Sequence, residues 1–455
     1  MTTDQRRHIK RNFTLGVLNG ALVNLGLAFI DPFTVIPVFI TRLGGSSVLV
    51  GLTAAVFGAG WFFPQAFVAP LVETRRRVLP IYNAMSLVRL AGFAVVIAAV
   101  FGLGSGRPHL LLAAILAGLA INTLAAGVSG VPFLEVTSKA FPANARGTFF
   151  GTRRFFGGAL GVFAGVLVAI ILGTDQASPG ALGAAHERVA AAVRAAGLQG
   201  RAFPDNYGVL FALGAVCAAL GYAAFSMVRE IPAQTVHPHR SLRAHLDEGF
   251  ALLRRHANYR LFLWVRVCWQ MTAMAFPFYA IYAFVRLGFS EASVGVFVSV
   301  WVGAGVVSNF AWGRLLDRKG NRLVMVATAA IAVLPPVAML LLGRASDGHG
   351  RGAFLVLCAA FLVNGAARAG RFITNLTYLL EFVPQDHRPR TVGFMNTISS
   401  PFMLSPVVGG LLVQAFGFEV LFGASALFAL ISIAVSARLA EPRAERYVGP
   451  TVVAP

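Results

Sequence analysis

The residues of this chain that could do chemistry are charged side chains standing inside long apolar runs. Asp31 lies in AFIDPFTVIP, and Arg368 and Arg371 lie in NGAARAGRFI. A charge within a hydrocarbon layer is costly, so it usually faces the interior of a helix bundle and has a partner or a task. A buried carboxylate can carry a proton. A guanidinium can hold a carboxylate or phosphate at two points.

Each of these charges also has a structural interpretation. Asp31 precedes Pro32, which loosens the local backbone, so the carboxylate is either a proton carrier or the partner of an arginine or a helix end. Arg368 and Arg371 lie one turn apart on a shared helix face and have no acidic neighbour at helical spacing. Their partners must come from other helices, with Asp31 as one candidate, or from a substrate.

Four more polar residues are candidates for contact with a substrate. Arg266 and Gln270 lie one turn apart in a tryptophan-containing run. Arg266 could instead extend to the nearer membrane surface. Asn122 and Asn375 are also candidates, although asparagines in membranes commonly form hydrogen bonds between helices.

An ion pair is predicted at the inner mouth of the bundle. Glu135 ends one apolar run, while Arg153 and Arg154 enter the next one. A structural pair is favoured over a role in ion coupling. Arg89 has no visible partner and receives no assignment.

No catalytic or cofactor-binding pattern accompanies these charges. The sequence has no His/Asp or Ser/Lys set at one depth, so an enzyme is not expected. It has no nucleotide-binding P-loop. The three cysteines lack paired spacing and the histidines match no common site, so neither a metal nor a cofactor is predicted.

The composition explains why these charges must lie in a membrane. The chain has 57% hydrophobic and only 12% charged residues, with a mean hydropathy of +0.73. That leaves too little polar surface for a water-soluble protein of 455 residues. The net charge of +20 does not indicate nucleic-acid binding, because the arginines stand in short clusters between apolar runs.

The apolar runs predict an all-α membrane protein with about twelve crossings of roughly 20 residues each. The expected spans are 13–40, 47–71, 79–103, 109–134, 147–173, 206–228, 259–286, 293–316, 322–343, 352–380, 391–416 and 418–438. The basic start RRHIKR and the other basic loops fall on one side, which makes that side and both termini cytoplasmic. The expected location is the cytoplasmic (inner) membrane.

An internal repeat divides the chain into two related halves. Arg42-Leu43-Gly44 matches Arg286-Leu287-Gly288 at an offset of 286 − 42 = 244, and Asn122 matches Asn364 at an offset of 242. Two similarly oriented six-helix halves imply a pseudo-twofold axis along the membrane normal, with a site near the midplane.

The expected domains follow from the repeat. They are an N-terminal bundle at 1–228 with an outer loop at 174–205, an amphipathic cytoplasmic linker at 229–258, a C-terminal bundle at 259–440 and a cytoplasmic tail at 441–455. A short helix is predicted in the outer loop and another in the linker.

The stretch Gly313-Arg-Leu-Leu-Asp317-Arg318-Lys-Gly320-Asn-Arg322 resembles the loop signature G-x-x-x-D-R-x-G-x-[KR] of the major facilitator superfamily. The resemblance covers about residues 10–440. It implies the twelve-helix fold of that family and alternating access, with Asp317 as part of a latch and Gly313 allowing two helices to approach closely. In the first half, Glu73 and Arg75 keep the acid and the following base, whereas both glycines are missing.

The sequence therefore predicts a monomeric secondary transporter for a small organic solute, with a proton as the coupling ion. Export of an amphipathic compound is the favoured function, and uptake of an organic anion is the alternative. A non-transporting membrane receptor or scaffold is the alternative from another class.

Overall fold

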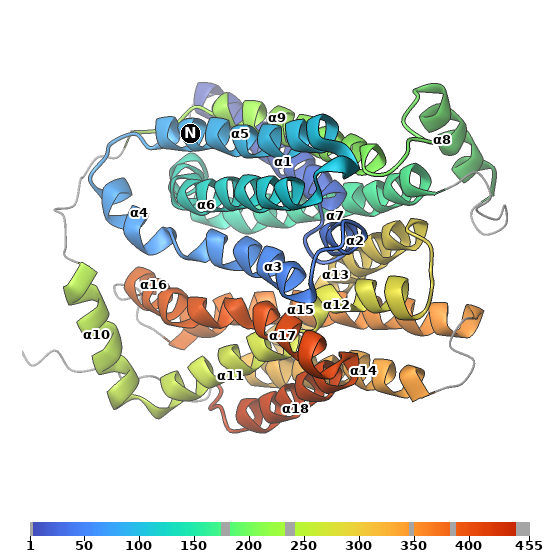
Figure 1. The fold of residues 1–455 in the computed structure, drawn as a ribbon. Helices are drawn as coiled ribbons and strands as arrows, with labels where there is room; N and C mark the ends of the chain where they lie inside the picture. The colour runs from blue at the N-terminus through green and yellow to red at the C-terminus, as the bar shows by residue number, and fades with distance from the viewer. Residues whose placement is uncertain (1–2, 174–182, 233–241, 345–349, 383–387, 443–455) are drawn as a thin grey trace, which may run out of the picture.

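The computed structural model describes residues 3–173, 183–232, 242–344, 350–382 and 388–442, and these residues form helices and short connections without a strand. Parts of the predicted outer loop and linker, and most of the tail, lie outside the described residues. The two short helices predicted in the loop and the linker are confirmed as α8 and α10 (Figure 1).

The first half contains nine α-helices among the described residues: α1 (Thr3–Phe29), α2 (Val35–Arg42), α3 (Ser47–Phe62), α4 (Gln65–Glu73), α5 (Leu79–Leu103), α6 (Pro108–Ala140), α7 (Ala143–Leu172), α8 (Gly183–Ala195) and α9 (Asp205–Ser226). A short 3-10 turn, η1 (Gly104–Gly106), follows α5.

After the linker helix α10 (Leu242–Arg255), the second half comprises α11 (Ala257–Ala273), α12 (Phe276–Ile281), α13 (Ala292–Lys319), α14 (Asn321–Arg344), α15 (Arg351–Phe382), α16 (Arg388–Ser399), α17 (Ser405–Phe416) and α18 (Phe418–Ala437). The π-helical turn η2 (Tyr282–Arg286) extends α12, and η4 (Ser400–Leu404) joins α16 to α17.

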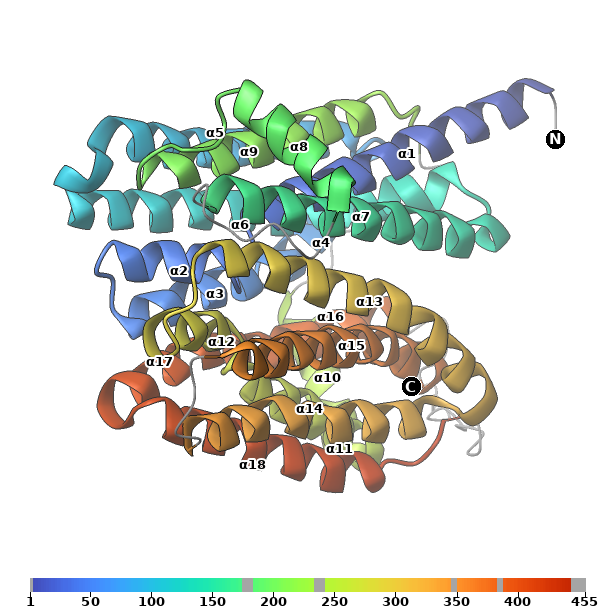
Figure 2. The ribbon, with the colours of Figure 1, turned by 90° about the vertical axis from the view of Figure 1, so that its right-hand side faces the viewer.

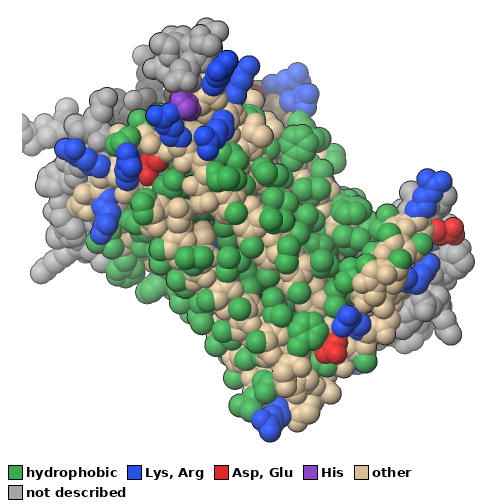
Figure 3. Space-filling model, turned by 90° about the horizontal axis from the view of Figure 1, so that it is seen from above, with side chains coloured by type: hydrophobic (Ala, Val, Ile, Leu, Met, Phe, Trp, Pro, Cys, Tyr) green, Lys and Arg blue, Asp and Glu red, His purple; other side chains and the backbone are tan. Residues whose placement is uncertain are grey.

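Among the described residues, 11 helical segments are long and apolar enough to cross a membrane, and Ser47–Phe62 is a shorter apolar helix. Together they account for the expected twelve crossings, so the all-α membrane fold is confirmed. The outer surface agrees with this assignment. In the face shown in Figure 3, hydrophobic side chains cover the middle and Lys and Arg lie toward the two ends.

Four expected spans are not continuous α-helices: the eleventh passes through the 3-10 turn η4, and three others are broken by non-helical residues. The first span stops at Phe29 and resumes at Val35, across Pro32; the second is interrupted before Gln65, at Pro64; and the seventh is interrupted between Ala273 and Phe276. Proline lacks an N–H and disfavours helix in the residue before it, which explains the first two breaks. The breaks in spans one and seven match by the repeat, because 31 + 244 = 275.

The two halves form two layers, with the first half above the second in Figure 2. We call the end at which α1 begins and α10 lies the basic end, and the end at which α2 finishes and α13 begins the opposite end. One hydrophobic core joins both halves at the opposite end, including Phe39 and Val50 of the first half with Phe278 and Val294 of the second. Toward the basic end, the buried clusters belong to one half or the other.

Candidate functional site

Asp31 lies at the break between α1 and α2, where its carboxylate accepts hydrogen bonds from its own turn. The Phe33 backbone N–H donates to Asp31 Oδ1 at 3.0 Å, and the Thr34 hydroxyl donates to the same oxygen at 2.8 Å. The side chain is buried. Among the described residues Asp31 forms no ion pair within 4.0 Å, although it interacts electrostatically with Arg368 of the second half. The structure therefore gives Asp31 a local structural role.

An aromatic cluster surrounds this break. Phe33 lies with its ring centroid 5.1 Å from Phe276 and 6.1 Å from Trp301, and Phe276 lies 5.3 Å from Trp301. Phe33 comes from the first half, whereas the other two come from α12 and α13. Such tilted and edge-on contacts contribute about 0.5–1.5 kcal/mol per pair beyond burial. The cluster therefore closes the interface between the halves on the side toward the opposite end.

Arg368 lies in the middle of α15 and faces this cluster. Its guanidinium carbon is 5.1 Å from the centre of the Phe33 ring and 5.3 Å from that of Trp301. The side chain is nevertheless exposed. Since its ring neighbours lie in the interface, the exposure is toward the space between the halves and not toward lipid. In the described part of the chain, its guanidinium forms no hydrogen bond and no ion pair.

Arg371 and Arg154 extend this group toward the basic end. The Arg371 guanidinium lies 6.0 Å from the Trp269 ring centre, and its Nε is buried without a hydrogen-bond partner. Arg154 of α7 is exposed and lies 3.8 Å from the ring centre of Phe372 on α15, in the other half. Arg368 interacts electrostatically with both of these arginines. We call Asp31, the three arginines and the aromatic cluster the inter-half site.

The charges in the middle of the bundle do not balance. Asp31, in the break between α1 and α2, is one carboxylate, whereas the described helices carry six guanidinium groups within their apolar runs: Arg89, Arg153, Arg154, Arg266, Arg368 and Arg371. None of the six forms an ion pair in the part of the chain that the structure describes. A desolvated charge without a partner is strongly unfavourable, so this excess of positive charge requires an explanation.

Two of these arginines are held by asparagines within their own half. Arg153 donates to Asn19 Oδ1 at 2.9 Å, and Arg266 donates to Asn396 Oδ1 at 3.0 Å. Arg266 is buried, so the expectation that it extends to the membrane surface is wrong. The two pairs join the first and fifth spans of each half, with the arginine and the asparagine exchanged.

The other predicted contact residues differ in placement. Asn122 is buried between α5 and α6, where it donates to the Arg89 carbonyl at 3.0 Å, so it belongs to the packing of the first half. Asn375 lies on α15 with its Oδ1 buried and without a partner. Gln270 on α11 is half-buried, and its backbone carbonyl accepts a hydrogen bond from the Ser405 hydroxyl at 2.8 Å.

The ion pair predicted at the inner mouth is absent from the salt bridges of the described residues. Glu135 instead pairs with Lys139 at 3.0 Å, one turn along the same helix. Arg153 and Arg154 take the partners given above, because neighbouring positions on α7 point to different faces. One faces α1 within the first half and the other faces the second half.

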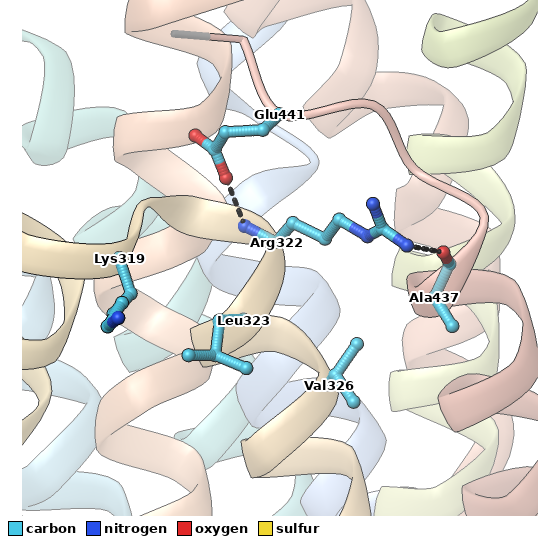
Figure 4. A pocket seen from close by; sticks show the side chains of 6 residues that line it. All are labelled: Lys319, Arg322, Leu323, Val326, Ala437 and Glu441. Carbon is cyan, nitrogen blue, oxygen red and sulfur yellow. Dashed lines mark hydrogen bonds between the residues drawn. The ribbon is translucent and has the colours of Figure 1, made fainter. Parts of the chain in front are cut away.

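The loop with the superfamily signature caps a helix within the second half. Gly320 ends α13 with a φ of 84°, a conformation that favours glycine. Glu441, which follows α18, accepts from the Arg322 backbone N–H at 2.8 Å, and the Arg322 guanidinium donates to the Ala437 carbonyl at 2.5 Å (Figure 4). These residues line a surface pocket at the basic end, distant from the inter-half site.

The first half repeats this cap. Glu230, four residues after α9 ends, accepts from the backbone N–H groups of Val78 at 2.7 Å and Leu79 at 2.9 Å, at the start of α5. Both acids were missed in the sequence. Their signal is an acid followed closely by proline after the sixth span of each half, in Glu230-Ile-Pro232 and Glu441-Pro442.

The predicted latch residues are only partly brought together. Nothing lies within 4 Å of a Cβ built at Gly313, so no helix approaches it closely in this conformation and that expectation is wrong here. Asp317 and Arg318 are exposed at the same end of α13. The Glu73 side chain lies outside the described residues, and Arg75 is exposed.

Contacts across the interface seal the opposite end. A Cβ built at Gly51 would lie 2.0 Å from the Pro406 carbonyl oxygen, and one at Gly410 would lie 2.4 Å from that of Ser47. At the same end, Arg42 forms an ion pair and hydrogen bond with Glu291 of the second half. The inter-half site is therefore shut off at the opposite end, while Arg154 and Arg368 remain exposed.

Solved structures of other proteins share the fold of this chain. A D-xylose-proton symporter structure covers 96% of this chain and 99% of its own length, with a TM-score of 0.70 and 13% identity. A variant of the nucleoside transporter NupG covers 94% and 98%, with a TM-score of 0.67 and 14% identity. A bacterial homologue of the iron transporter ferroportin, in an inward-facing state, covers 94% and 98%, with a TM-score of 0.64 and 13% identity.

These likenesses show that the chain has the fold of these multi-pass membrane transporters. Residues 261–453 match the family model of the Major Facilitator Superfamily. The second half of the chain is therefore similar in sequence to the Major Facilitator Superfamily, and the whole chain has the fold of the transporters named above. A search of curated proteins finds no match to the chain.

Proposed function

We propose that the protein is a secondary active transporter that moves a small amphipathic organic solute by alternating access around the inter-half site. The observation that carries the proposal is the one-sided closure. The halves share one core and an ion pair at the opposite end, yet Arg154 and Arg368 remain exposed between them. A transporter that opens its central site to one side at a time must pass through such a state.

The basic end is the cytoplasmic end in this proposal, and the termini and the linker lie there. The support is the arginine content of the segments on that side, since short cytoplasmic loops keep an excess of Lys and Arg. The conformation is then inward-open. When the basic end closes, the segment from Gly313 to Arg322 would act as the latch that holds α13 against the first half.

Asp31 is the proposed proton carrier. It is the one carboxylate at mid-bundle depth in the described residues, and it interacts electrostatically with Arg368. Asp31→Asn should abolish transport driven by a pH gradient while exchange of solute across the membrane continues, because the amide resembles the protonated acid. Unchanged pH dependence in this variant would remove Asp31 from the mechanism.

Export of an amphipathic compound is the proposed direction, and the aromatic cluster supports the amphipathic part of this proposal. Uptake of an organic anion is the second candidate, favoured by the unpaired Arg368 and Arg371. Transport of labelled aromatic cations, anions and neutral compounds in inside-out and right-side-out vesicles separates the two. Accumulation only in right-side-out vesicles would contradict export.

Alternating access is tested by locking the opposite end. Cysteines replacing Arg42 and Glu291, in a chain with Cys217, Cys268 and Cys358 changed to serine, should be joined by a short bifunctional thiol reagent. Transport should stop and should return when a reducible linker is cleaved. Each single cysteine variant is the matched control and should keep transporting after treatment. Full transport by the linked protein would refute the proposal.

A further inference from the structure

We infer that the inter-half site takes a small organic anion, a carboxylate or phosphate group attached to an apolar or aromatic body. This inference rests on the proposed function and names the chemical class of the solute. It arises from Arg154, Arg368 and Arg371, which face the same space from both halves and which the described part of the chain leaves without hydrogen bonds or ion pairs.

Helical spacing shows that these arginines face the interface. Arg154 precedes Gly158 and Gly161 by one and two turns, and a Cβ at either glycine would contact α13 at Val306 or Val302. On α15, Arg368 lies one turn from Phe372, which is 54% exposed and contacts Arg154 of the other half. Positions three or four apart share a helix face. The exposure of Arg154 and Arg368 is therefore exposure to the space between the halves.

Protein groups do not satisfy this positive charge. Arg153 and Arg266 have asparagine oxygens as acceptors, so the chain does supply partners to buried arginines where it needs them for packing. Among the described residues, the contacts of the three arginines of the site are with aromatic ring faces. Asp31 interacts electrostatically with Arg368, but its Oδ1 already accepts hydrogen bonds from Phe33 and Thr34. An anionic ligand supplies the missing acceptors, and a guanidinium binds a carboxylate or phosphate at two points.

The aromatic cluster determines what is attached to the anionic group. Phe33, Phe276 and Trp301 meet one another on the side toward the opposite end, and Arg368 lies beside two of these rings. A ligand held by the arginines would place its other end against these rings. A compact inorganic anion leaves that surface uncovered, so an organic anion with an apolar body fits better.

The location of the arginines also links binding to closure. Arg154 and Arg368 come from different halves and interact electrostatically with each other, so their like charges oppose closer approach of the halves at the basic end. An anion between them converts this repulsion into attraction. The ligand then binds the closed form more tightly than the open one, which is the condition for a ligand to shift a conformational equilibrium.

The experiment uses the full chain purified in detergent and four probes of similar size: phenyl phosphate, benzoate, the neutral benzamide and the cationic benzylammonium. Binding is measured by quenching of tryptophan fluorescence, since Trp269 and Trp301 lie beside Arg371 and Arg368. We expect the two anions to bind and the other two probes not to bind. Arg368→Gln and Arg371→Gln should each weaken anion binding at least about tenfold. Arg371→Lys should restore part of the loss.

Arg314→Gln is the matched control, because Arg314 is an exposed arginine on α13 whose guanidinium, among the described residues, donates a hydrogen bond to the Phe310 carbonyl of its own helix, at 3.4 Å. It should bind the anions as the unchanged protein does. Equal binding of benzamide and phenyl phosphate, or unchanged binding by both glutamine variants, would overturn the inference.

A second measurement needs no ligand. Arg368→Met should raise the melting temperature of the protein without anion, because it removes a charge that lacks a partner. A lower melting temperature would show that the arginine has a structural partner and would overturn the inference. If none of the four probes binds, the change in melting temperature of Arg368→Met decides whether the inference stands.

The two proposals fail separately. Vesicle transport of a neutral or cationic compound, without anion binding, would keep the transporter proposal and refute the anion site. Arginine-dependent anion binding without movement in either vesicle orientation would keep the site and refute transport.

Discussion

The two ends of the same pair of helices differ in how closely they pack. Near the opposite end, α7 and α13 meet at glycines: a Cβ at Gly295 would lie 2.2 Å from the Ala169 backbone nitrogen, and one at Gly165 would lie 2.6 Å from the Gly295 carbonyl oxygen. Near the basic end, nothing lies within 4 Å of a Cβ at Gly151 or Gly313. Figure 2 shows the two helices diverging toward that end.

The difference arises from position and not from residue type. Gly295 and Gly313 are 313 − 295 = 18 residues apart on α13, which is five helical turns at 3.6 residues per turn, so both point to the first half. In this conformation Gly295 packs against α7, whereas nothing lies within 4 Å of a Cβ built at Gly313. If the protein alternates, the two should exchange these conditions. Small residues on a helix face allow close approach of neighbouring helices, and a larger side chain prevents it.

The largest effect is expected from replacing Gly295 or Gly313 with leucine. Gly295→Leu should prevent closure of the opposite end, and Gly313→Leu should prevent closure of the basic end. Overpacking costs about 1–3 kcal/mol, and 1.4 kcal/mol already changes the populations tenfold. Each variant should lose at least about tenfold in transport rate, with opposite effects on the labelling of a single cysteine at Ser299 from the side of the opposite end.

Ser299 is a suitable reporter because its hydroxyl now donates to the Val162 carbonyl across the interface, at 2.9 Å. Gly102→Leu, at a position with nothing within 4 Å at the edge of α5, is the control and should change neither measurement. The same labelling result in both Leu variants would show that the two ends do not alternate.

The second effect separates contacts within a half from contacts between halves. Glu230 and Glu441 cap α5 and α14 inside their own halves at the basic end. Replacing such a cap costs about 0.5–2 kcal/mol of stability. Glu230→Gln should cost more than Glu441→Gln, because Glu230 accepts from two backbone N–H groups and lies 3.9 Å from Lys139. Thermal unfolding measures the loss. Altered Ser299 labelling in either variant would show that the caps also control the interface.

The sequence was sufficient to predict what depends on local composition. A helix must satisfy its backbone within itself to cross lipid, so the apolar runs gave the spans, and the repeat gave the two halves. Pro32 indicated a weakened first span. The break at Met274 was missed, because the proline involved, Pro277, lies after the break at the start of α12 and does not interrupt the apolar run.

The partners of the charges could not be predicted in the same way. Glu135 was assigned to Arg153 or Arg154 because they come close in sequence, whereas Arg153 binds Asn19, 134 residues away. Which side of a helix faces which neighbour depends on the rotation of packed helices, and local spacing does not determine this. The repeat contained one usable signal: at the offset of 242, Asn396 lies one residue from the equivalent of Arg153 (153 + 242 = 395), and their partners Asn19 and Arg266 lie on the equivalent first spans.

A smaller effect is expected from the ion pair that joins the halves at the opposite end. The Arg42 side chain is 34% exposed, so solvent screens the pair and it should contribute only about 0.2–1 kcal/mol. Arg42→Gln should increase Ser299 labelling no more than about fivefold while Glu291 is present, because it leaves that carboxylate buried without its partner, and should change labelling less in a chain that carries Glu291→Gln. Additive effects of the two changes would show that the residues do not act as a pair. Arg286→Gln, which breaks the exposed contact with Glu419 inside the second half, is the control.

The smallest effect expected is a pH dependence of closure at the opposite end. Glu291 precedes α13, outside the spans, and its neighbours from the first half are Arg42 at the end of α2 and Tyr207 on α9. Burial, which outweighs the charge of Arg42, raises the pKa of Glu291 above its ordinary value. When that end opens, the carboxyl returns to water and its pKa falls toward the ordinary value, so the closed form holds the proton more tightly. Closure should therefore be favoured as pH falls into the range of the raised pKa and lose that contribution as pH rises through it.

Labelling of the Ser299 cysteine from the side of the opposite end, corrected for thiol reactivity with an always exposed cysteine at Gly44, should decline as the pH is lowered. Glu291→Gln cannot take up the proton and should remove the trend. A trend that persists in Glu291→Gln would assign it to another group, and labelling that rises as pH falls would mean that the charged pair with Arg42 outweighs burial.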